Sequence, residues 1–124
     1  MLVIDKISRT PIYEQIVEGI QREILLGLLK PSQQLPSIRE LAVTLSANPN
    51  TVQKAFIELD RRGIIISSPG RGCFVADDAP ELLRIRLKSK ISDIKTIASE
   101  LATFGVSEDE IISAIKEAYS EKDC

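Results

Sequence analysis

Residues 35–59 read LPSIRELAVTLSANPNTVQKAFIEL, and this stretch contains the start signals of two short helices. Ser37 and Glu40 have the three-residue spacing of a capping box at a helix N-terminus. Asn48 and Pro49 form a second start signal, because asparagine caps a helix and proline fits its first turn. Since only a short turn separates the two helices, the stretch predicts a helix-turn-helix.

The apolar residues of this stretch have the spacing of two buried helix faces. Positions i, i+3, i+4 and i+7 lie on one side of a helix. The first helix carries Ile38, Leu41, Ala42 and Leu45 at this spacing, and the second carries Val52, Ala55, Phe56 and Leu59. We therefore expect each helix to bury one face and to expose the other.

Another helix is predicted before this stretch, over residues 9–26. Thr10 is its expected N-cap, and Pro11 is its expected first helical residue. Isoleucines recur every four residues, at positions 12, 16, 20 and 24, and form one apolar stripe. Gly27 suits the end of this helix.

A β-hairpin is predicted after the stretch. Residues 64–67 are mostly isoleucine, residues 68–72 read SPGRG, and residues 73–75 read CFV. A strand, a glycine-rich turn and a second strand indicate a hairpin, and a hairpin directly behind a helix-turn-helix is a wing. The predicted fold is therefore mostly α with a small β-hairpin wing: a winged helix-turn-helix over residues 1–76 and a helical tail over residues 77–124.

The tail is predicted to contain a long helix over about residues 79–104 and a short helix opened by the capping box Ser107 to Glu110. The long helix carries an apolar seam with steps of four and three residues: Leu87, Ile91, Ile94, Ala98 and Leu101. This seam has two interpretations, packing against its own winged helix or pairing with another chain. Because two helices make a poor core by themselves, we favour a homodimer.

The composition disfavours an enzyme. The chain has 124 residues, a net charge of −2 and no histidine, which is the commonest general base and metal ligand. Cys73 and Cys124 form no metal-ligand pattern and no disulfide framework. No apolar run approaches the ~20 residues of a membrane helix. We therefore expect no catalytic residue, no metal, no cofactor and no membrane partner, and we expect the reducing cytoplasm as the compartment.

The exposed face of the predicted second helix of the helix-turn-helix carries side chains that can read DNA. Asn50 and Gln53 can pair with adenine in the major groove, and Lys54 can donate to guanine or phosphate. Thr51 lies in the first helical turn, where a hydroxyl and backbone N–H groups can bind a phosphate. Taken alone, these residues also fit an ordinary solvated face.

Two further groups strengthen the DNA interpretation. Ser37 and Arg39 lie at the start of the first helix, which crosses the DNA backbone in this motif. Arg71 lies between Gly70 and Gly72 at the wing tip, with the reach to enter a minor groove or bind phosphate. The order of capped helices, short turn and basic hairpin favours nucleic acid over the alternative of a protein-binding winged helix.

Four blocks of the sequence resemble the GntR family of bacterial regulators. They are PIYEQI at residues 11–16, LPSIRELA at residues 35–42, NPNTVQKA at residues 48–55 and GRGCFV at residues 70–75. The NPNTV block and the short helical tail resemble the YtrA-like branch of the family. Ser32 replaces a frequent glycine, and Pro49, Asn50 and Gln53 stand where other branches often carry arginine or threonine. The operator sequence therefore cannot be taken from those branches.

The resemblance implies a transcription regulator, more often a repressor, that binds a palindromic double-stranded DNA operator as a homodimer through its tail helices. It adds Pro49 and the wing glycines to the candidate contacts. The complete set of predicted DNA-binding residues is Ser37, Arg39, Pro49, Asn50, Thr51, Gln53, Lys54, Gly70, Arg71 and Gly72. The sequence leaves open whether a small-molecule effector binds between the tail and the winged helix.

Overall fold

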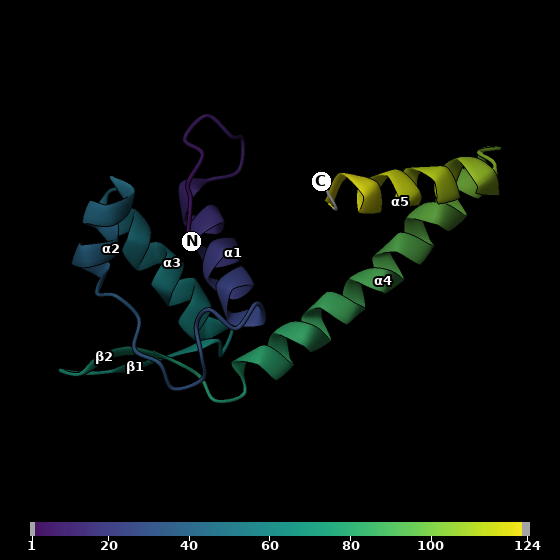
Figure 1. Cartoon of the computed structure of the whole chain (residues 1–124). Helices are drawn as coiled ribbons and strands as arrows, with labels where there is room; N and C mark the ends of the chain where they lie inside the picture. The colour runs from purple at the N-terminus through teal and green to yellow at the C-terminus, as the bar shows by residue number, and fades with distance from the viewer. Residues whose placement is uncertain (1, 123–124) are drawn as a thin grey trace. The chain divides into compact units, whose positions relative to one another are not determined.

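The computed structural model describes residues 2–122 and has five helices and one hairpin in that range (Figure 1). In chain order the elements are α1 (Ile12–Leu25), α2 (Ile38–Leu45), α3 (Pro49–Arg61), β1 (Ile65–Ser68), β2 (Gly72–Val75), α4 (Ala79–Thr103) and α5 (Glu108–Lys122). The prediction of a mostly helical fold with a winged helix-turn-helix is confirmed. Cys124 lies outside the described residues.

The chain forms two compact units, Met1–Ile85 and Arg86–Cys124. The division falls inside α4, so the first turns of this helix belong to the N-terminal unit. Ala79 and Leu83 of α4 are buried there together with the core of the winged helix. The functional division expected between residues 76 and 77 stays a prediction.

The core of the first unit lies where α1 and α2 pack against α3 beside the hairpin (Figure 1). The isoleucine stripe of α1 is buried from Ile16 onward, as the four-residue spacing predicts. The buried residues of the other elements are Leu41 and Ala42 of α2, Val52, Ala55, Phe56 and Leu59 of α3, and Ile65 and Val75 of the hairpin. This packing exposes the opposite face of α3 to solvent.

The predicted caps of α2 and α3 are confirmed. The Ser37 hydroxyl accepts the N–H of Glu40 at 3.0 Å, and the Asn48 side-chain oxygen accepts the N–H of Asn50 at 2.8 Å. Between the helices, Ser46 adopts a left-handed conformation with φ of 52°, which ends α2 abruptly. These short-range bonds satisfy backbone N–H groups that the first turns of α2 and α3 would otherwise leave unpaired.

The predicted N-cap of α1 is wrong. Pro11, not Thr10, is the last extended residue, with φ of −54° and ψ of 146°, and no side chain caps the helix. The Thr10 carbonyl instead accepts a hydrogen bond from the Gln15 amide at 2.9 Å, and this same amide also donates to the Asp5 carbonyl. The Gln15 side chain thus binds the N-terminal segment to α1. The helix starts one residue later than the capping rule indicates.

The hairpin pairs β1 with β2 in antiparallel register from Ile65 opposite Val75 to Ser68 opposite Gly72. The connector between α1 and α2 lies against β2: the Leu35 N–H donates to the Cys73 carbonyl at 2.8 Å, and the Val75 N–H donates to the Gln33 carbonyl at 2.9 Å. Hydrogen bonds to β2 on its outer side thus attach the connector to the hairpin.

Within the described residues, no helix is both long enough and apolar enough to cross a membrane. In the same range, no group of three or more histidine, cysteine, aspartate or glutamate side chains is placed to hold a metal ion.

Glu58 joins two arginines at the C-terminal end of α3. Its carboxylate accepts hydrogen bonds from Arg61 at 2.6 and 2.9 Å and from Arg62 at 2.6 Å. Arg62 also donates to the Gln21 side chain of α1 at 3.1 Å, so the cluster links α3 to α1. The hydrogen bonds from Arg61 and then Arg62 lower the pKa of Glu58 to about 2.

We expect Glu58→Gln to lower the melting temperature at neutral pH and to lose this effect in acid. Because the folded pKa lies below the ordinary value of 4.5, the ionised carboxylate stabilises the fold above pH 4.5, and this stabilisation disappears as the pH falls towards 2. Thermal unfolding at a series of pH values checks this. Glu18→Gln, which changes an exposed glutamate of α1, is the control. A melting difference for Glu58→Gln that is independent of pH would refute the role of the charge.

Candidate nucleic-acid interface

The exposed face of α3 presents the side chains that the sequence predicts to read DNA. Asn50 and Gln53 are both exposed, and within the described residues neither side chain is hydrogen-bonded to the protein. Thr51 is half-buried in the first turn, where its N–H donates to the Asn48 carbonyl at 2.9 Å. Two free carboxamides one helical turn apart are therefore available for base edges.

Lys54 leans towards α1 and lies over an aromatic ring. Its ammonium nitrogen is 4.0 Å from the centre of the Tyr13 ring. The Tyr13 hydroxyl donates to Glu14 at 3.2 Å, and this hydrogen bond raises the pKa of Tyr13. Sequence reasoning missed Tyr13, because the contact depends on how α1 packs against α3.

We expect the contact between Lys54 and Tyr13 to contribute roughly 0.5–1 kcal/mol to stability, as for other exposed cation–π pairs. A double-mutant cycle of Tyr13→Leu and Lys54→Met, measured by urea unfolding, isolates this coupling. Tyr13→Phe is the control, because it keeps the ring and should keep the coupling. A coupling energy of zero would mean that the two side chains are only neighbours.

The start of α2 offers a second group of candidate contacts. Arg39 is exposed, and within the described residues its guanidinium has no partner. The Ser37 hydroxyl is occupied by the N–H of Glu40, so Ser37 acts first as a cap. The first-turn amides of Ile38 and Arg39 precede the capped one, and the positive end of the helix dipole favours an anion such as phosphate near them.

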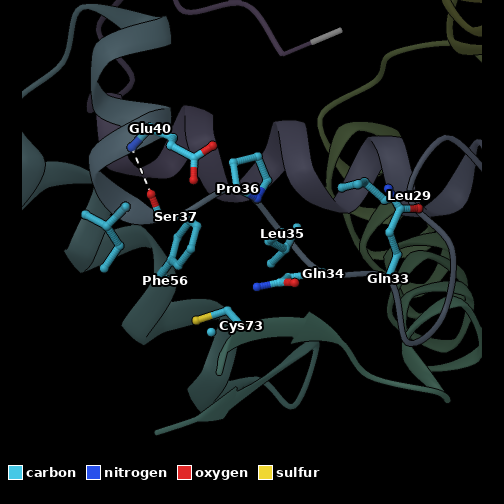
Figure 2. A pocket seen from close by; sticks show the side chains of 11 residues that line it. Leu29, Gln33, Gln34, Leu35, Pro36, Ser37, Glu40, Phe56 and Cys73 are labelled. Atoms are coloured by element: carbon cyan, nitrogen blue, oxygen red, sulfur yellow. Dashed lines mark hydrogen bonds between the residues drawn. The ribbon is translucent and has the colours of Figure 1, made fainter. Parts of the chain in front are cut away.

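A hollow of about 660 Å³ lies between the start of α2 and the wing. Figure 2 shows Ser37 and Glu40 on one side of this hollow, Cys73 on the opposite side, and Phe56 and Leu35 between them. Ser37 and Gly72, which are 35 residues apart in sequence, both line it. The structure thus brings one predicted contact of α2 and one of the wing to the same hollow, whereas Arg39 and Arg71 lie outside its lining.

The wing tip is a tight turn that presents Arg71. The Arg71 N–H donates to the Ser68 carbonyl at 2.9 Å, Pro69 follows Ser68, and Gly70 has a φ of 75°. These features are those of a type II turn, in which glycine supplies the positive φ. Arg71 is exposed, and its guanidinium has no partner among the residues that the structure describes.

The tail carries the predicted dimerisation seam on α4. Leu87, Ile91, Ile94 and Leu101 are exposed in the single chain, between 39% and 55%, and Ala98 is half-buried. Within the second unit, α4 and α5 line an open apolar hollow of about 510 Å³. Its lining includes three seam residues together with residues of α5 and the turn before it: Ile94, Ala98, Leu101, Val106, Ile111 and Ile115.

A helix-turn-helix whose second helix exposes one polar face, followed by a hairpin with arginine at its tip, is a winged helix-turn-helix DNA-binding module. The family model described as bacterial regulatory proteins, gntR family, matches residues 12–75, from α1 to β2. The chain belongs to this family and is a DNA-binding transcriptional regulator. Membership confirms the resemblance seen in the sequence, and it places the chain among regulators rather than enzymes.

Individual relatives agree with this assignment. The chain is 45% identical over 101 residues to the HTH-type transcriptional repressor YtrA of Bacillus subtilis, which covers 82% of this chain and 75% of that protein. A GntR family transcriptional regulator from Listeria monocytogenes has a TM-score of 0.72 at 33% identity, covering 92% of this chain and 98% of that chain. The structure of AraR(DBD) in complex with operator ORX1 has a TM-score of 0.55 at 32% identity, covering 60% of this chain and 93% of that chain.

Proposed function

We propose that this regulator is a repressor that binds a palindromic DNA operator as a homodimer. The observation that carries the proposal is the exposed face of α3, where the carboxamides of Asn50 and Gln53 are free of protein partners. A carboxamide can bind adenine through two hydrogen bonds in the major groove, so these side chains can provide sequence discrimination. The relative named as a repressor and the relative bound to an operator support this proposal.

The remaining candidate contacts suit the sugar-phosphate backbone and the minor groove. Arg39 provides an exposed positive charge at the start of α2, and the first amides of this helix provide hydrogen-bond donors. Arg71 provides a free guanidinium at the wing tip, which can enter a narrow minor groove. Phosphate contacts of this kind provide much of the affinity without reading sequence, which explains how a chain of net charge −2 can bind DNA: the charge is placed locally.

A second copy of the chain is the proposed partner of the tail. The seam leaves a row of large apolar side chains exposed on α4, and the hollow between α4 and α5 continues this apolar surface. A two-fold dimer repeats the same surface on both subunits and presents two recognition helices to a palindromic site. Because a bacterial operator lies in the cytoplasm, the proposal places the protein there.

Selection of bound sequences from random duplex DNA tests the proposed function. We expect a palindromic consensus. We also expect the affinity for the selected duplex to fall steeply with salt: a plot of the logarithm of the binding constant against the logarithm of the salt concentration should have a slope of about −0.9 for each phosphate neutralised. An enriched sequence without two-fold symmetry would argue against the dimeric arrangement. No enrichment at all would favour the alternative of a protein-binding winged helix.

A further inference from the structure

The side chain of Gln34 bridges the connector before α2 and the tip of the wing. Its amide nitrogen donates to the Arg71 carbonyl at 2.9 Å. The backbone of Gln34 pairs with Phe74 of β2 in an isolated antiparallel bridge, flanked by the hydrogen bond from Leu35 to Cys73. The Gln34 side-chain amide is therefore held near the wing tip, because the Gln34 backbone is itself paired with β2.

Gly72 leaves the space that this amide occupies. A Cβ atom at position 72 would lie 2.7 Å from the Gln34 amide nitrogen, closer than real Cβ contacts allow. Gly72 also has a φ of 117°, a conformation that other residues rarely adopt. Figure 2 shows Gln34 on the connector side of the same hollow as Cys73, the residue that follows Gly72. The absence of a side chain at Gly72 thus makes room for the Gln34 side-chain amide.

Both backbone polar groups of Arg71 are consequently fixed. Its N–H is held by Ser68 within the turn, and its carbonyl is held by Gln34 from outside the hairpin. A two-stranded hairpin is marginally stable by itself, so its tip needs an external attachment to hold one orientation. The guanidinium itself remains free for a ligand.

We propose that Gln34 is a positioning residue that holds the wing tip so that Arg71 meets DNA in one orientation; this rests on the proposed function. Gln34 acts through Arg71 rather than by touching DNA. Fixing a side chain before binding reduces the ordering that binding requires, and this increases affinity without any new contact.

The test is a double-mutant cycle on the duplex that the unaltered chain selects from random DNA. Gln34→Met keeps the length of the side chain but removes the donor, and it should weaken binding by roughly two- to tenfold, the fold-change of one hydrogen bond. In the Arg71→Ala background, Gln34→Met should cause no further loss. Gln33→Met is the matched control, because the Gln33 side chain accepts the Lys30 N–H rather than bonding the wing, and its backbone bond to Val75 is unaltered. This variant should bind as the unaltered chain does.

A second measurement needs no DNA. Amide relaxation by NMR should show larger nanosecond motion at Arg71 and Gly72 in Gln34→Met, while the melting temperature stays near that of the unaltered chain because the bonds between the connector and β2 remain. If the amides of Arg71 and Gly72 in Gln34→Met are as rigid as in the unaltered chain, the proposal is overturned. This measurement decides the matter even if the chain selects no duplex and the proposed function fails. An equal loss from Gln34→Met with and without Arg71 also overturns it, because Gln34 would then contact DNA directly. A Gln34→Met chain that binds the selected duplex as tightly as the unaltered chain would overturn it too.

Discussion

The Ile94→Glu chain is expected to sediment as a monomer at concentrations where the unaltered chain sediments as a dimer. Ile94 belongs to the seam of α4 and also lines the apolar hollow between α4 and α5. In the proposed dimer this substitution buries an unpaired carboxylate, which costs about 3–5 kcal/mol when no partner charge is present. At such a cost the dissociation constant rises by roughly two to four orders of magnitude.

Sedimentation velocity over a series of concentrations measures this effect. Ser92→Glu is the matched control, because it adds the same charge to α4 two residues, or about 200° of helical rotation, from Ile94. Circular dichroism should show that both variants keep their helices. If Ile94→Glu sediments as the unaltered chain does, the interface lies elsewhere. An unaltered chain that remains monomeric at all concentrations would remove the dimer from the proposal.

Loss of the dimer should also weaken DNA binding. Two linked recognition helices bind a palindrome more tightly than one, because the second contact is made at a high effective concentration. Ile94→Glu lies in the second compact unit, so it leaves the winged helix itself unaltered. The variant should therefore bind a single half-site as the unaltered chain does and lose affinity only on the complete palindrome.

The features that the sequence predicted correctly depend on contacts between near neighbours in the chain. The caps at Ser37 and Asn48 each join residues two or three positions apart, so the local pattern contains both partners. The buried face of α3 follows from helical spacing alone. The error at Thr10 arose because the Gln15 side-chain amide donates to the Thr10 carbonyl, a contact that no capping rule describes.

The features that the sequence did not predict join distant residues. Gln34 and Arg71 are 37 positions apart, and Tyr13 and Lys54 are 41 apart. Neither contact leaves a periodic pattern, because each involves a single side chain and depends on how one element packs on another. The spacing identified the residues on the exposed face of α3, but only the structure shows that Lys54 is engaged by α1 while Gln53 is free.

This difference between Lys54 and Gln53 leads to the second large effect. Gln53→Ala should weaken binding to the selected duplex by roughly 1–3 kcal/mol and leave binding to a scrambled duplex unchanged. The reason is that a carboxamide bound to adenine provides discrimination between bases, whereas phosphate contacts are the same on any sequence. Competition binding on the two duplexes at one fixed salt concentration measures both affinities.

Arg39→Ala provides the contrasting variant for this experiment. As a proposed phosphate contact, Arg39 should contribute equally to the affinity for both duplexes. Its removal should reduce by about 1 the slope of the logarithm of affinity against the logarithm of salt concentration. Gln53→Ala removes no charge, so its salt slope should match that of the unaltered chain. Equal losses from Gln53→Ala on the selected and scrambled duplexes would show that Gln53 does not read bases. The reading would then have to come from another candidate contact of α3, such as Asn50 or Lys54, or from the shape of the DNA.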